Sequence, residues 1–300
     1  LNVAGFGPLF EGMKYNGKVE DLPYRKSVWV LYYNKDLFDQ MGVSYPSEDM
    51  TWAEFRTLAG KMTKGKGNDK QWGAYIHTWE ICSFGPAIQT GATLIDEDLS
   101  PFIEALQLRL DLENDGSVMS YVDQIATSAY FDAFFKGNIA MNVQGDWHIS
   151  QLRRAEKEGT LDFDWDIVPL PHPEGVSPNT TWGMPTTMAI SSRCKNKEAA
   201  WKFLKYITGP EGAKVNVALG KLPAFTNEEI KNIYLGDGSK KTDNLGIVLD
   251  QKVYVEYPAI PGINVIVKTI YKEESELFIA GEQSSAELIK NIKQRPKEEL

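Results

Sequence analysis

The sequence comprises 300 residues with 41 acidic and 32 basic side chains, and its formal net charge is −9. This surplus of negative charge repels a phosphate backbone, so the composition argues against a nucleic-acid-binding protein. Hydrophobic residues make up 42% and charged residues 24%, as in ordinary globular proteins, and no apolar run approaches the roughly 18–20 residues needed to cross a bilayer.

The N-terminal part of the chain predicts a buried strand followed by a short helix. Residues 1–26 are rich in glycine and aromatic residues, and Tyr15–Lys18 has the composition of a turn. The apolar run Val28–Tyr33 is typical of a buried strand. The helix after it begins near Asn34, and Gly42 can end it in a left-handed cap.

The next elements are two longer helices and a second strand. Thr51 and Glu54 have the spacing of a capping box, and apolar residues recur at helical spacing behind them. Ser100 and Pro101 open a further helix, because proline is tolerated in the first turn. Ile139–Val143 follows a Lys-Gly turn and predicts a strand.

The second half of the chain continues the alternation. Strands are predicted over Asp164–Leu170 and Met188–Ile190, and an amphipathic helix over Glu198–Ile207, with Phe203 on its inward face. The last helix follows a second capping box at Ser284–Glu287. Strands that alternate with helices of about 10–15 residues predict an α/β architecture with largely parallel sheets, and the length allows two lobes.

The sequence contains no motif for covalent or metal chemistry. His77, His148 and His172 lie far apart and lack the spacing of zinc ligands. The aspartates within Asp162–Asp166 alternate like the first ligands of a calcium loop, but Pro173 stands where such a loop needs glutamate. No nucleophile elbow, phosphate-binding loop or dinucleotide-binding loop is present. We therefore expect no catalytic residue, no metal and no cofactor. Paired carboxylates for glycoside hydrolysis leave no sequence signature, because their spacing is a property of the fold.

Aromatic residues offer a different kind of site. The chain has eight Trp and 13 Tyr, and Trp79, Trp147 and Trp182 stand where loops are predicted to follow strands. An exposed indole in a cleft presents a flat apolar face to the C–H face of a sugar ring, while polar groups nearby bind the hydroxyls. A place in the core is the alternative for each Trp, and composition alone favours it.

Several motifs, taken in order, resemble the family 1 extracellular solute-binding proteins of bacteria, which include maltose-binding protein. Each motif alone is weak, and the resemblance depends on their shared order and spacing. The C-terminal part matches in pattern more than in motif. The matching segments are Tyr15–Lys18, Val30–Phe38, Tyr45–Phe55, Phe134–Met141, Gly145–Trp147, Pro169–Pro171, Trp182–Gly183, Met188–Ser191, Lys195–Phe203 and Thr208–Gly212.

The resemblance implies a two-lobed periplasmic-binding-protein-like α/β fold, with the ligand in a cleft between lobes that close on binding. It assigns residues 1–27 and 187–235 to the first lobe and residues 28–182 and 240–300 to the second. Family members begin with about 80–120 further residues, so the resemblance predicts an incomplete first lobe with an open sheet and exposed apolar helix faces.

In function, the resemblance implies an extracytoplasmic receptor, either periplasmic or held at the cell surface as a lipoprotein. The receptor would bind a carbohydrate reversibly, with an oligosaccharide as the favoured ligand. It would act without catalysis, as a monomer, and deliver its ligand to the transmembrane subunits of an ABC permease. The residues that the resemblance and their neighbourhood nominate for ligand binding are Trp147, Trp182, Trp79, Glu80, Asp146, Tyr24 and Ser27.

Three alternatives stay open at this point. A non-sugar solute such as glycerol phosphate would need basic residues in the cleft, and Arg25 and Lys26 lie near the first crossing between the lobes. A glycan-cleaving enzyme would need a proton donor and a base, for which Glu80 and Asp146 are the only pair we can nominate. A receptor domain that feeds a sensor kinase would look the same in sequence.

Overall fold

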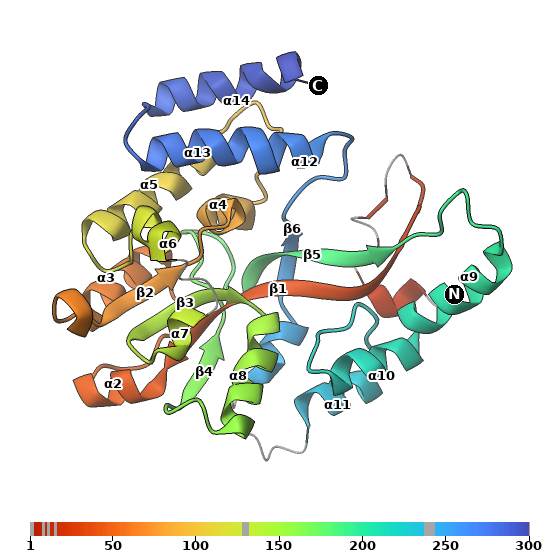
Figure 1. The fold of residues 1–300 in the computed structure, drawn as a ribbon, viewed down its shortest axis with the longest axis horizontal. Helices are drawn as coiled ribbons and strands as arrows, with labels where there is room; N and C mark the ends of the chain where they lie inside the picture. The colour runs from red at the N-terminus through yellow and green to blue at the C-terminus, as the bar shows by residue number, and fades with distance from the viewer. Residues whose placement is uncertain are drawn as a thin grey trace.

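The long strand β1 (Leu22–Asn34) lies at the centre of the molecule (Figure 1). The structure is a computed structural model that describes residues 3–7, 10, 13–14, 17–127, 132–236 and 244–299. The turn predicted at Tyr15–Lys18 begins outside these residues, so its first half is not described. In the described part, no helix is long and apolar enough to cross a membrane.

The sheet is mixed, with strand order β2-β3-β1-β5-β6 and with β4 also paired to β1. β1 runs antiparallel to three partners, and among the strands of the described residues only the pairs β2–β3 and β5–β6 are parallel. The prediction of largely parallel sheets is therefore wrong. The helical crossovers do connect parallel strands, as predicted, but these strands are the pairs β2–β3 and β5–β6. The central strand between these pairs runs the other way. The other strands are β2 (Trp72–Ile76), β3 (Ile139–Gly145), β4 (Trp165–Val168), β5 (Thr180–Met188) and β6 (Lys252–Val255).

β1 changes neighbours along its length. Its first half, Leu22–Val28, pairs with the end of β5, and its second half, Trp29–Asn34, pairs with β3 and β4. The strand predicted at Met188–Ile190 is in fact the last residue of β5 and the coil after it. β1 and β5 together connect the helices at the two ends of the molecule (Figure 1).

Helices cover both faces of the sheet (Figure 1). The helix Ile263–Ile279 is continuous, and its middle turn, Ile266–Tyr271, has π-helical hydrogen bonding. The α-helices are α2 (Lys35–Met41), α3 (Trp52–Met62), α4 (Glu80–Gln89), α5 (Ser100–Asn114), α6 (Tyr121–Thr127), α7 (Asp132–Phe135), α8 (Trp147–Glu158), α9 (Lys197–Thr208), α10 (Pro210–Ala218), α11 (Glu228–Leu235), α12 (Ile263–Val265), α13 (Lys272–Ile279) and α14 (Ser285–Glu299). Short helical turns cover Val3–Phe6, Gly67–Asp69 and Leu245–Leu249.

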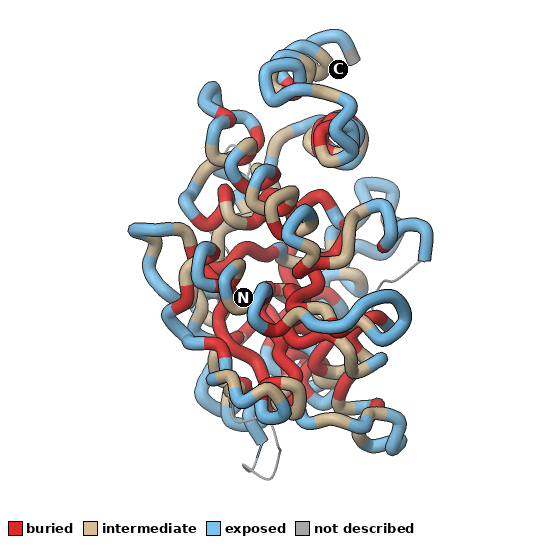
Figure 2. Tube along the Cα trace, turned by 90° about the vertical axis from the view of Figure 1, so that its left-hand side faces the viewer, coloured by how far each residue is buried: buried red, intermediate tan, exposed pale blue. Residues whose placement is uncertain are grey.

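Two hydrophobic cores lie on opposite faces of β1. The odd-numbered residues of Trp29–Tyr33 pack with α3, α4, α5 and α14, and the even-numbered residues of Val28–Tyr32 pack with α8, α10 and α11. Successive side chains of a strand point to opposite faces, so a strand buried on both sides reads as one apolar run. Figure 2 shows this buried centre and the exposed turns of the surrounding helices.

The local signals in the sequence are confirmed where capping decides the helix ends. Asn34 caps the start of α2, and Gly42 ends it with φ of 62°. The Thr51–Glu54 capping box forms at α3, and Ser284 and Glu287 exchange the same pair of hydrogen bonds at α14.

The apolar face of α9 is partly exposed, although the sequence predicted that Phe203 points inward. Leu204 is buried, but Phe203 is 57% exposed and its neighbours Trp201 and Tyr206 are 41% and 55% exposed. The expectation of an exposed apolar helix face is met at this helix. The assignment of residues to two lobes stays a prediction, and the second core includes residues from both predicted lobes, such as Leu152 of α8 and Val217 of α10.

Candidate functional site

A cavity of about 670 Å³ opens beside the middle of β1, a size typical of small-molecule sites. Its walls come from β1, β5, the first residues of α4 and α8, the segment after β6, and the helix that contains the π-helical turn. We call it the tryptophan pocket. It is lined by Arg25, Ser27, Trp29, Trp79, Ile81, Trp147, Met184, Pro185, Thr186, Thr187, Glu256, Tyr257, Asn264 and Lys268.

Three indole rings form one wall of the pocket. Trp29 lies at the base and is met edge-on by Trp147 at 5.2 Å between ring centroids and by Trp79 at 6.2 Å. The rings of Trp79 and Trp147 lie 5.8 Å apart with an interplanar angle of 42°. Trp79 is 40% exposed, so part of its ring is available to a ligand.

The local backbone explains how Trp147 reaches this wall. It is the first residue of α8, directly after β3 and Asp146. A Cβ atom at Gly145 would stand 2.1 Å from the Trp147 ring, closer than any real contact, so the indole can lie over the end of β3 only because residue 145 is glycine. The Gly-x-Trp motif thus has a direct steric cause.

Glu256 places a carboxyl group in the pocket wall. It accepts a hydrogen bond of 2.7 Å from Nε1 of Trp29, and its burial raises its pKa to about 7. At neutral pH the group therefore exists in both protonation states. As a neutral acid it can donate a hydrogen bond, and as a carboxylate it can accept one.

A second polar cluster joins α4 to the π-helical turn. The buried carboxylate of Glu80 forms an ion pair with Lys268 and accepts a 3.1 Å hydrogen bond from the hydroxyl of Tyr257. Lys268 and Tyr257 line the pocket, and Glu80 stands behind them. Glu80 thus offsets the charge of Lys268 and holds both side chains in place.

The structure brings three of the nominated residues to the pocket, namely Trp79, Trp147 and Ser27. Glu80 reaches it through its partners. The carbonyl of Tyr24, in contrast, accepts hydrogen bonds from Asn216 and from the amide of Ala224, away from the pocket lining.

Two nominated residues belong to the interior. Trp182 is fully buried, and its ring packs over Gly85 and lies 5.9 Å from Trp29. It has no surface to offer a ligand, so we correct its expected role to core packing. Asp146 is 1% exposed and accepts a hydrogen bond from the amide of Val28 at 3.1 Å. Burial raises its pKa to about 6.

The residues that sequence reasoning missed are Trp29, Glu256 and Lys268. Trp29 stands inside an apolar run, where a strand buried on both sides gives no sign of a pocket. Glu256 and Lys268 come from the C-terminal part, where the motifs are weak. No sequence spacing signals them, because the fold brings them to β1 from more than 200 positions away.

In the part of the chain that the structure describes, the pocket shows neither a cluster of metal ligands nor the nominated catalytic pair. Among the described residues, no group of three or more His, Cys, Asp or Glu side chains could hold a metal ion. The nominated catalytic pair does not form an open acid and base, because Glu80 is held by Lys268 and Asp146 is buried. Cys82 and Cys194 are free cysteines, and Cys82 is buried.

Comparison with known proteins places the chain in a bacterial protein family. Residues 6–214 match the model of the family described as bacterial extracellular solute-binding protein. The chain is similar to the solved structure of a sugar transporter from Rhizobium etli in an open conformation, with 32% identity, a TM-score of 0.86, and coverage of 97% of this chain and 75% of that one.

Two further relatives name different ligands. An ABC substrate-binding protein from Listeria monocytogenes, solved in complex with cycloalternan, is 27% identical with a TM-score of 0.80, covering 96% of this chain and 74% of that one. The sn-glycerol-3-phosphate-binding periplasmic protein of Rhizobium meliloti is 23% identical over 91% of this chain and 66% of its own length. The chain spans 60% of the length of the first curated relatives that it matches.

Proposed function

Because the chain belongs to the bacterial extracellular solute-binding protein family, we propose that it is an extracytoplasmic receptor that binds a carbohydrate reversibly in the tryptophan pocket. The similar structures named above include a sugar transporter and a complex with cycloalternan. Both lend weight to a carbohydrate ligand for this chain.

The observation that carries the proposal is the wall of three indoles beside polar side chains. Trp79 and Trp147 can stack on the apolar faces of sugar rings, while Glu256 and Lys268 can bind hydroxyl groups. An oligosaccharide is the favoured ligand, because separate rings can stack on separate indoles.

The family also supports the remaining parts of the proposal. The receptor delivers its ligand to the transmembrane subunits of an ABC permease, acts as a monomer, and performs no catalysis. It works in the periplasm or at the cell surface as a lipoprotein. The pocket provides no open pair of carboxyl groups, which fits a role in binding alone.

A phosphorylated solute is the second candidate. Two cationic side chains, Arg25 and Lys268, line the pocket, and one relative binds sn-glycerol 3-phosphate. However, Glu80 offsets the charge of Lys268, and Glu256 adds negative charge as it ionises. A phosphate group would face the carboxylate of Glu256 and a lysine whose charge Glu80 already offsets, so a neutral sugar suits the pocket better.

The test is a titration of intrinsic tryptophan fluorescence with mannotriose, cycloalternan, D-mannitol and sn-glycerol 3-phosphate. We expect a saturable response to a sugar, weakened about fivefold or more by Trp79→Ala or Trp147→Ala, since the stacking of an aromatic residue is worth about 1 kcal/mol or more. Trp201→Ala is the matched control, because Trp201 is 41% exposed but lies on α9, outside the pocket. A response to sn-glycerol 3-phosphate alone would replace the carbohydrate proposal.

A further inference from the structure

We propose that the buried side chain of Arg109, acting with His77, fixes the position of the pocket residue Trp79. This inference rests on the proposed function, because it treats Trp79 as a ligand-stacking residue. Arg109 and His77 touch no ligand themselves in this proposal and act as positioning residues.

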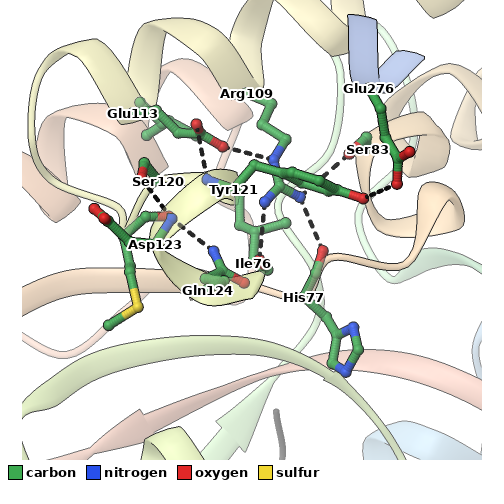
Figure 3. A network of polar contacts seen from close by, with 12 residues as sticks. Ile76, His77, Ser83, Arg109, Glu113, Ser120, Tyr121, Asp123, Gln124 and Glu276 are labelled. Atoms are coloured by element: carbon green, nitrogen blue, oxygen red, sulfur yellow. Dashed lines mark hydrogen bonds and ion pairs between the residues drawn. The ribbon is translucent and has the colours of Figure 1, made fainter. Parts of the chain in front are cut away.

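The guanidinium of Arg109 lies in the middle of the polar network that Figure 3 shows. Its side chain is 2% exposed and forms an ion pair with Glu113, with 2.8 Å between Nε and Oε1. Nη1 donates to the carbonyl of His77 at 2.8 Å and to the hydroxyl of Ser83 at 3.2 Å, and Nη2 donates to the carbonyl of Ile76 at 3.3 Å.

These acceptors lie on both sides of Trp79 in the chain. Ile76 ends β2, His77 follows it, and Ser83 lies in α4, whose N-terminus is capped by Trp79. The rigid guanidinium of Arg109 therefore forms a fork of N–H donors that joins the two ends of the short segment carrying the indole. Arginine suits this task, because its five N–H donors have a fixed planar geometry.

His77 completes the link to the indole. Its Nδ1 accepts a hydrogen bond of 3.0 Å from the backbone amide of Trp79, and the two rings lie 4.5 Å apart between centroids. The Trp79 ring is thus enclosed by His77 on one side and by Trp29 and Trp147 in the pocket wall.

A further layer holds the arginine itself. The ring of Tyr121 in α6 lies 5.2 Å from the guanidinium carbon, and its amide donates to Oε2 of Glu113 at 3.0 Å. The Tyr121 hydroxyl donates to Glu276 of α13 at 2.5 Å (Figure 3). The network therefore ties β2, α4, α5, α6 and α13 together directly behind one wall of the pocket.

The location of the network speaks for a role in binding. A buried ion pair seldom adds stability beyond what apolar residues of similar size provide, but it does hold its partners in one arrangement. A binding site gains affinity when its contact groups are immobilised before the ligand arrives. An arginine that restrains Ile76 and His77 before Trp79 and the helix after it supplies that immobilisation.

The first experiment needs no ligand. The protein is labelled with 5-fluorotryptophan, and the ¹⁹F signal of Trp79 is assigned by its loss in Trp79→Phe. In Arg109→Lys the charge next to Glu113 remains but the fork is lost, so we expect the Trp79 signal to shift and broaden while the Trp201 signal stays unchanged. An unchanged Trp79 signal in folded Arg109→Lys overturns the proposal.

Arg56→Lys is the matched control for this variant. Arg56 also forms ion pairs with α5 and the residue after it, through Asp111 and Asp115, but its side chain is 38% exposed and lies outside the network. We expect no change of the Trp79 signal in this variant. An equal change in both arginine variants would mean that any disturbance of α5 moves the indole, and it would overturn a specific role for Arg109.

A second pair of variants keeps the test decisive if Arg109→Lys does not fold. His77→Ala removes the acceptor for the Trp79 amide, whereas the side-chain oxygen of His77→Asn can replace Nδ1. We expect His77→Ala to broaden the Trp79 signal and His77→Asn to restore it. Equal signals in the two variants contradict the proposal.

The last arm measures binding of mannotriose in a double-mutant cycle. Arg109→Lys should weaken the affinity roughly three- to tenfold when Trp79 is present and should have no further effect in Trp79→Ala. The same loss in both backgrounds indicates a general structural role and overturns the proposal. If the parent protein does not bind mannotriose or any other sugar, the proposed function fails, and the ¹⁹F signals still decide whether Arg109 positions Trp79.

Discussion

The two walls of the tryptophan pocket are supported very differently. Behind Trp79, α4 and α5 pack through Phe84, Phe102 and the Arg109 network. On the other side, β5 carries the pocket residues Met184–Thr187, and the helix that follows it, α9, exposes three large aromatic side chains. The comparison teaches that the aromatic wall is built on a fully packed core, whereas the helix beyond the β5 wall keeps much of its apolar surface exposed.

The strongest test of this difference in packing is to truncate one phenylalanine on each side. Phe84 is 1% exposed and Phe203 is 57% exposed. We expect Phe84→Ala to lower the free energy of unfolding by about 3–5 kcal/mol, because it leaves a cavity in the core. Phe203→Ala should change it by less than about 0.5 kcal/mol. Urea unfolding of the two variants measures both effects. Equal losses would show that the α9 face is covered in solution.

A smaller effect is expected at Glu256, which lies between the two walls. Its pKa rises from 4.5 to about 7 on folding, because burial disfavours the carboxylate. Between these pH values the folded protein keeps a proton that the unfolded chain has released. The free energy of unfolding therefore falls as the pH rises from about 4.5 to about 7.

The isosteric variant Glu256→Gln removes this ionisation and retains an acceptor for Trp29. It should be more stable than the parent at pH 8, by on the order of 2–3 kcal/mol, and nearly equal to it at pH 5. Melting temperatures at both pH values measure the difference. Glu282→Gln, the same substitution at an exposed position, is the control. A constant difference between Glu256→Gln and the parent would contradict the raised pKa.

The smallest effect should come from the exposed ion pair of α9, which we compare with the buried pair of α5. Arg109–Glu113 and Lys202–Glu198 have the same spacing of four residues within a helix, but the side chains are 2% and 9% exposed in the first pair and 72% and 83% in the second. We expect Lys202→Ala to cost at most about 0.5 kcal/mol, since solvent and salt screen the exposed pair. The midpoint of urea unfolding of the Lys202→Ala variant should also be insensitive to salt. A loss above about 1 kcal/mol in Lys202→Ala would contradict the contrast between the walls.

The sequence predicted best what short-range chemistry decides. Thr51 and Glu54 form their capping box whatever lies around them, and Val28–Tyr33 is buried on both faces because all six residues are apolar or aromatic. Of the three nominated residues that line the pocket, Trp147 is the one whose motif has a local steric cause.

The remaining features depend on partners that are distant in the chain. The direction of β1 relative to β3 and β5 follows from which strands the crossovers join, and residue patterns do not encode that choice. Trp182 and Trp79 look alike in sequence, yet one packs over Gly85 and the other borders the pocket. Glu256 and Lys268 lie at the pocket because the C-terminal part of the chain returns to β1.

The contact between Gly145 and Trp147 also restricts the order in which this protein can accumulate mutations. Any side chain at position 145 would collide with the indole, since even a Cβ atom would stand 2.1 Å from it. Position 145 can therefore change only if the indole moves or residue 147 becomes smaller, whereas a smaller residue 147 causes no clash with Gly145. Once both have changed, a return to tryptophan requires that the glycine come back first. The order of substitutions at these two positions therefore matters. The indole can be lost in one step, but it can return to this position only when residue 145 is glycine.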